Sequence, residues 1–146
     1  MVLAVGAQGK IITYSTSGCA APASGVQAAL EDVTIVGGHV YAVGQQDPLG
    51  TNHGVMIHAT SQTAPFVSIK TNTAVPFYGV WGASVTDVFA AGGKATVLRT
   101  SGAMVSPKQI PIATSTETLL AVWGAGAKDL FVTSDKGKIY RYHLVP

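Results

Sequence analysis

The feature that most constrains this chain is an internal repeat with an offset of 42 residues. Residues 78–82 (Tyr-Gly-Val-Trp-Gly) and 87–89 (Asp-Val-Phe) recur as residues 120–124 (Leu-Ala-Val-Trp-Gly) and 129–131 (Asp-Leu-Phe). Periods of this length are typical of stacked small units, as in solenoids and propellers. The chain is therefore expected to be a series of similar units.

Two weaker copies lie upstream. Residues 40–44 (Val-Tyr-Ala-Val-Gly) align with residues 88–92 (Val-Phe-Ala-Ala-Gly), and residues 2–6 (Val-Leu-Ala-Val-Gly) fit the same frame. The repeat thus extends over the whole chain, as a single domain with units near 1–29, 30–72, 73–114 and 115–146.

Each copy predicts short β-strands. Runs rich in β-branched and aromatic residues are bounded by Gly, Asp or Ser, and no segment keeps a helical period. With strands lettered a to d from the inside outward, the chain is predicted to run b-c-d, then a-b-c-d twice, then a-b-c. Residues 64–71 and 105–113 are the candidates for strand d. This predicts an all-β fold of tandem four-stranded antiparallel blades, with about three and a half units.

Composition excludes several classes of protein. Apolar residues make up 47% and charged residues 11% of the chain, a balance that predicts folding rather than disorder. No apolar run approaches the roughly 20 residues of a membrane-spanning helix, and the start of the chain does not resemble a signal peptide. Lysines and arginines are scattered singly, which argues against nucleic acid as a partner. Abundant Ser and Thr weakly favour an exported protein.

The motif resembles the blades of a broad group of bacterial β-propellers. Those blades carry Val-Trp-Gly, a four-residue gap, Asp-Val-Phe-Ala-Val-Gly and then Gly-x-Ile, a pattern of the WG-repeat type. Residues 80–92 and 122–139 carry it well, residues 36–57 loosely, and residues 2–14 only in its second half. The resemblance implies a β-propeller fold and little about function, because propellers include lectins, hydrolases, lyases and scaffolds.

The residues that recur in register within the repeat are predicted to be structural. Trp81 and Trp123 would fill the wedge between neighbouring blades. Asp87 and Asp129 would lie at the tight turn between strands a and b, where a carboxylate accepts backbone N–H groups. Paired aromatic residues could instead stack on sugars, and paired acids could act in catalysis. Repetition in register favours packing, since a catalytic residue is needed only once.

The best candidate for a ligand site is the loop between residues 44 and 54. It is longer than the equivalent turns and is expected on the face where the b–c and d–a connections emerge. The alternative is a solvated insertion. Its polar residues are Gln45, Gln46, Asp47, Asn52 and His53.

No residue pattern predicts catalysis, a metal or a cofactor. Asp47, His53 and His58 could be assembled into a metal site on paper, but His58 is better interpreted as a strand residue. Residues 133–140 look like the Asp-box of sialidase-type propellers, a turn-stabilising element that usually joins strands c and d. Here the segment joins strands b and c, so ordinary hairpin chemistry is the favoured interpretation. Cys19, the only cysteine, is expected to be a buried or half-buried thiol, with pairing to another chain as the alternative.

These observations favour a binding or interaction module for a glycan or a protein. The alternative is part of a propeller hydrolase or lyase whose catalytic residues lie partly on other blades or another chain, and a purely structural blade set is a third possibility. The first unit begins at strand b and the last stops after strand c. A homodimer, or a second chain, is therefore expected to complete the ring.

Overall fold

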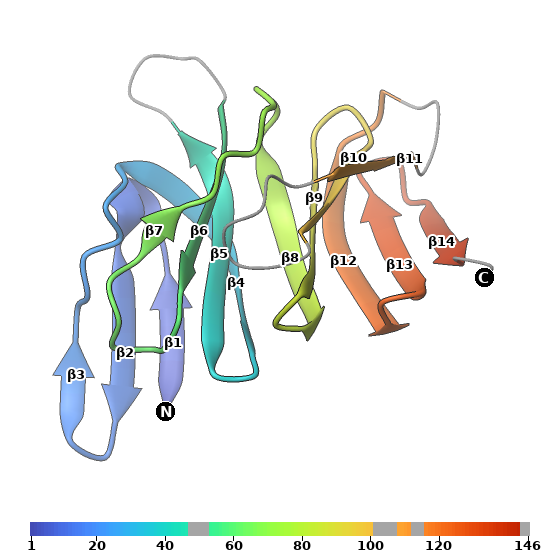
Figure 1. Ribbon diagram of the computed structural model, residues 1–146. Coiled ribbons are helices and arrows are strands. Elements are labelled where there is room, and N and C mark those ends of the chain that lie inside the picture. Colours follow the sequence, from blue (N-terminus) through green and yellow to red (C-terminus); the bar gives the residue numbers. More distant parts are fainter. Residues whose placement is uncertain (47–52, 101–107, 112–115, 144–146) are drawn as a thin grey trace.

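A computed structural model describes residues 1–46, 53–100, 108–111 and 116–143. Within these residues the chain forms fourteen strands in four antiparallel sheets, with one short 3₁₀ turn, η1 (Ala7–Gly9). The all-β prediction is confirmed. Figure 1 shows the four sheets side by side in chain order, from the N-terminal sheet at the left to the C-terminal sheet at the right. No helix in this part of the chain is long and apolar enough to cross a membrane.

Within each sheet, neighbouring strands are also neighbours in sequence, so every connection is a hairpin or a short link. The first sheet contains β1 (Val2–Val5), β2 (Ile11–Ser15) and β3 (Gly18–Ala20). The second contains β4 (Ala28–Val36), β5 (His39–Gln46), β6 (His53–Ala59) and β7 (Val67–Ser68). The third contains β8 (Phe77–Ser84), β9 (Asp87–Gly92), β10 (Thr96–Thr100) and β11 (Lys108–Pro111). The last contains β12 (Leu119–Gly126), β13 (Asp129–Ser134) and β14 (Ile139–His143).

The middle of β9 is apolar at four successive positions because both faces of this strand are buried. On β9, Val88 and Ala90 pack toward the second sheet, whereas Phe89 and Ala91 pack toward the last sheet. All four side chains are fully buried. Successive side chains of a strand point to opposite faces, so a strand between two sheets needs apolar residues in both sets.

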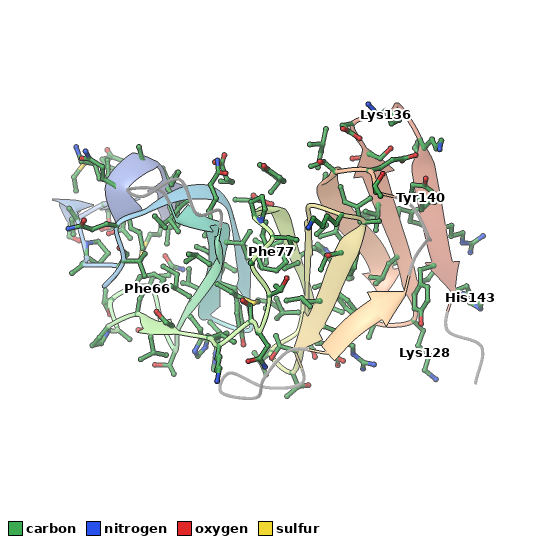
Figure 2. The ribbon with its side chains drawn as sticks, turned by 90° about the horizontal axis from the view of Figure 1, so that it is seen from above. Phe66, Phe77, Lys128, Lys136, Tyr140 and His143 are labelled. Atoms are coloured by element: carbon green, nitrogen blue, oxygen red, sulfur yellow. The ribbon has the colours of Figure 1, made fainter. Side chains whose placement is uncertain are left out.

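The core is divided into three layers, one between each pair of neighbouring sheets. Ile11, Leu30 and Ile57 represent the layer between the first and second sheets. Phe77 lies between the second and third, and Leu119 between the third and last. Figure 2 shows Phe66 and Phe77 among the side chains of the interior. The fold therefore has no single central core.

The first strand of each of the last three sheets contains an irregularity at the same place. The register with the next strand shifts around Glu31, Tyr78 and Leu120, each of which is one extra residue opposite its partner strand. Such bulges re-aim the neighbouring side chains. After the first bulge, a carboxylate oxygen of Asp32 accepts the backbone N–H of Val80 in the next sheet at 2.8 Å.

Glycine allows neighbouring sheets to approach closely at two positions. A Cβ atom at Gly79 would lie 2.8 Å from the Cα of Ala121 on the next sheet. A Cβ atom at Gly124 would lie 2.9 Å from the outer ring of Trp81. These distances are too short for a side chain, so the two glycines are required by the packing of the third sheet against the last.

The turn between β9 and β10 is strained. Lys94 and Ala95 have φ angles of 52° and 51°, and the N–H of Thr96 donates to the carbonyl of Gly93 at 3.1 Å. Two successive residues with positive φ are typical of a type I′ turn, which favours Asn-Gly. The left-handed region costs roughly 1–2 kcal/mol for a residue with a Cβ.

We expect the double substitution Lys94→Asn and Ala95→Gly to stabilise the protein by about 1 kcal/mol, because it relieves this strain at some cost in chain entropy. The midpoint of urea unfolding measures the change. Lys136→Asn is the matched control, since Lys136 lies in the equivalent turn of the last sheet and is not among the residues with positive φ. A midpoint that stays constant or falls in the double variant would contradict the interpretation.

Candidate functional site

Half of the kinds of connection between strands lie on one side of the sheets, called here the loop face. It consists of the b–c turns and the d–a links. Backbone hydrogen bonds tie the two kinds of connection together. They join Leu30 N–H to Gly6, Gly93 N–H to Pro76, Ala95 N–H to Glu117, and Asp135 N–H to Thr118.

Part of the predicted ligand loop lies on this face. Gln45 and Gln46 end β5 and His53 begins β6, with Gln46 and His53 directly opposite each other. The side-chain amide of Gln45 donates to the Glu31 carboxylate at 3.1 Å. Asp47 and Asn52 lie outside the described residues. The predicted ligand-binding role of this loop stays a prediction.

Two hollows adjoin the loop face near the first and second sheets. The larger has a volume of about 640 Å³, and its polar lining includes Gln8, Lys10 and Ser24. The second has a volume of about 290 Å³ and is lined in part by Lys70 and Asn72. Both are open and carry lysines at their edges, so they could accept polar or acidic groups of a ligand. Sequence reasoning missed them, because each combines residues from separate loops.

At the other end of the loop face, Glu117 is held by three donors. Lys138 Nζ, the hydroxyl of Ser134 and the hydroxyl of Tyr140 donate hydrogen bonds to its carboxylate, and together they lower the pKa of Glu117 to about 2. Asp135 accepts the backbone N–H of Thr118 at 3.2 Å. The bonds between Asp135 and Thr118 therefore tie the turn between β13 and β14 to the preceding link.

The opposite side of the sheets carries a repeated ion pair. Asp87 begins β9, and its carboxylate binds the guanidinium of Arg99 on β10, with a bond of 3.0 Å to Nε. Burial alone would raise the pKa of Asp87, but hydrogen bonds from Arg99 and Ser84 hold it below its ordinary value. The guanidinium also lies 5.9 Å from the ring centre of Phe89, and Trp81 stacks on the other side of that ring at 6.0 Å.

The last sheet repeats this arrangement. Asp129 binds Arg141 through two bonds of 2.9 and 3.0 Å, and the bonds to Arg141 lower the pKa of Asp129. Arg141 lies 5.5 Å from the ring centre of Phe131, and Trp123 lies 6.2 Å from it. The aspartates occupy the predicted turns, but the structure pairs them with side-chain donors, chiefly Arg99 and Arg141, rather than with backbone N–H groups. Sequence reasoning missed both arginines, although Arg99 and Arg141 share the 42-residue offset.

The two tryptophans differ in their surroundings. Trp81 packs into the layer between the third and last sheets. Trp123 is 59% exposed, so the prediction that it fills a wedge in the core is wrong for this structure. The cause is that no described segment covers the outer face of the last sheet. The prediction for Cys19 is also wrong, because it lies exposed on β3, at the outer edge of the first sheet.

In the second sheet, two histidines replace the ion pair. His39 and His58 occupy the positions of Asp87 and Arg99, and their ring nitrogens Nδ1 and Nε2 are 2.9 Å apart. Tyr41 takes the place of Phe89 and stacks on His58 with ring centres 4.6 Å apart. His58 is fully buried, and burial together with the neighbouring His39 lowers its pKa.

Within the described ranges, no three His, Cys, Asp or Glu side chains lie close enough together to hold a metal ion. The histidine pair is explained by packing, as the sequence suggested for His58.

No protein-family model matches this chain, and no curated protein matches it. Solved structures do match. YCF48 from Cyanidioschyzon merolae aligns with 98% of this chain and 50% of its own length, with a TM-score of 0.71 and 12% identity. The structure of YCF48 bound to D1 peptide aligns with 99% of this chain and 51% of its own length, with a TM-score of 0.68 and 11% identity. The chain has a β-propeller fold. It spans about half the length of these propellers.

The histidine pair predicts a pH dependence for the propeller. The folded state lowers the pKa of His58, so the unfolded chain binds a proton more readily below the ordinary histidine pKa of about 6.5. The contribution of His58 to the free energy of unfolding is therefore fully present above that pH. It is lost as the pH falls through the folded pKa of His58. We expect His58→Gln to weaken this dependence between about pH 7 and 5, measured by urea unfolding at each pH.

The matched comparison is His39→Gln, which removes the smaller of the two causes that lower the pKa of His58 and leaves the burial of His58 in place. It should weaken the pH dependence less than His58→Gln does. Equal pH profiles for His58→Gln and the unsubstituted chain would show that the buried pair does not control this transition.

Proposed function

We propose that this chain is a protein-interaction module that binds a segment of another protein on its loop face. The proposal includes completion of the propeller ring by a second copy or by another chain. The observation that carries it is the likeness to YCF48 bound to D1 peptide, in which the same fold is present together with a peptide.

Two features of the loop face support a peptide ligand. The hollows of about 640 and 290 Å³ lie along one side of the sheets, where an extended segment can contact both. Their edges combine Lys10 and Lys70 with the side-chain amides of Gln8 and Asn72. Such groups can bind backbone carbonyls and acidic side chains. Gly54, at the end of the segment predicted to bind a ligand, lines the second hollow.

The test uses a phage-displayed library of random peptides to select a binder, whose affinity is then measured by calorimetry. We expect Lys70→Ala to weaken binding of the selected peptide about tenfold, equivalent to about 1.4 kcal/mol. Replacing residues 44–54 with the short turn of residues 92–95 should preserve folding and abolish binding.

Lys128→Ala is the matched control for this experiment. Lys128 is an exposed lysine in the a–b turn of the last sheet, on the side away from the loop face (Figure 2), so its removal should leave the affinity unchanged. Selected peptides that still bind after the loop replacement would place the site elsewhere. Strong binding on a glycan array with no peptide selected would favour a lectin-like module instead.

A further inference from the structure

Within the described residues, the large exposed apolar side chains lie mainly on two surfaces, one on the first sheet and one on the last. These two sheets stand at opposite ends of the row (Figure 1). The first end face is the outer face of the first sheet, and the last end face is the outer face of the last sheet. The first is formed by Val2, Ala4, Ile12 and Tyr14, which alternate with half-buried positions of β1 and buried positions of β2. The last is formed by Ala121, Trp123, Phe131, Thr133, Ile139 and Arg141.

The last end face repeats a surface that is buried elsewhere in the same molecule. Phe89, Ala91 and Val97 of the third sheet are fully buried against the last sheet. The corresponding positions of the last sheet are Phe131, Thr133 and Ile139, and Ile139 is 72% exposed. The buried face of the third sheet and the exposed last end face both carry a tryptophan, a phenylalanine and an arginine in the same arrangement.

The first end face corresponds to the other half of such an interface. Val40 and Ala42 in the second sheet occupy the positions of Val2 and Ala4, and both are fully buried against the first sheet. In the first sheet, Val2 is 65% exposed. A hollow of about 230 Å³ adjoins this face and is lined partly by Ala4 and Ile12. It offers a place for a protruding side chain of a partner.

The last end face therefore repeats one side of the interface that joins neighbouring sheets. The first end face repeats the part of the other side that strands b and c contribute, because the first sheet consists of β1, β2 and β3 and has no strand a. The alignment with half of YCF48 indicates that the four sheets cover about half of a ring. A contact between unlike surfaces closes into a ring when its rotation fits the number of copies, and two half rings meet this condition.

We infer that two copies of this chain associate head to tail about a two-fold axis, with the last end face of each against the first end face of its partner. This inference rests on the part of the proposed function that has a second copy complete the ring, and it needs no ligand. In the assembly, Trp123 and Tyr14 become buried. The Asp129–Arg141 pair becomes partly covered, as Asp87–Arg99 already is.

Sedimentation equilibrium of the 146-residue chain tests the inference. The expected mass is twice the monomer mass of 14.9 kDa. Trp123→Lys disables the last end face, and Tyr14→Lys disables the first. Each variant alone should sediment as a monomer, because every head-to-tail contact then contains one damaged face.

An equimolar mixture of the two variants is the decisive sample. The Tyr14→Lys variant supplies an intact last end face and the Trp123→Lys variant an intact first end face. One intact contact is therefore possible between them, and a heterodimer should form. The matched control is Val67→Lys, since Val67 is 42% exposed on the outermost strand of the second sheet, away from both end faces. It should remain dimeric. Circular dichroism verifies that all variants are folded.

Four outcomes would overturn the inference. They are a folded monomer of the unsubstituted chain, species larger than a dimer, a dimer that survives Tyr14→Lys, and a mixture that stays monomeric. Dimerisation is measured without peptide, and peptide binding is measured with variants of the loop face. Failure of one is therefore distinguishable from failure of the other.

Discussion

Every sheet of this fold depends on its neighbours to bury the side chains on both of its faces. The alternation of β9, with Val88 and Ala90 on one face and Phe89 and Ala91 on the other, leaves no face that is suited to water. Burial of apolar surface is the main favourable term in folding. The three layers between sheets therefore supply most of the favourable free energy of folding. The sheet at each end of the row keeps the apolar residues of its outer face exposed.

The layers are similar in design but not identical in chemistry. The position that holds Asp and Arg in the third and last sheets holds two histidines in the second. In the second sheet, Asp32 follows the bulge and bonds to the next sheet. In the third sheet, Gly79 occupies the equivalent position, and there the backbones of neighbouring sheets approach closely. Different residues thus join neighbouring sheets at equivalent positions of the different units.

Much of the fold was predictable because the repeat places equivalent residues at equal spacing. The 42-residue offset predicted the hairpins around Asp87 and Asp129, and the same offset would have revealed Arg99 and Arg141. The equivalence of His39 and His58 to this pair was hidden, because the second copy lacks both the tryptophan and the aspartate of the motif.

The exposure of Trp123 could not be read from its motif, since burial depends on what packs against a strand and not on the strand alone. The candidate site was predictable only in part. Gln45 is described at the edge of the loop face, whereas the hollows depend on the meeting of separate loops, which no local pattern encodes.

The exchange of an ion pair for two histidines has a consequence for ionic strength. Dissolved salt weakens the attraction between partly exposed charges, and the screening length falls to about 3 Å at 1 M. The carboxylate–guanidinium bridges of the third and last sheets are open to this effect, because the side chains of Arg99 and Arg141 are 38% and 61% exposed. The enclosed imidazoles of the second sheet carry no such attraction when neutral. Concentrated salt therefore acts unevenly along the chain, because it weakens the ion pairs of the third and last sheets and leaves the contact between the neutral imidazoles of the second sheet unchanged.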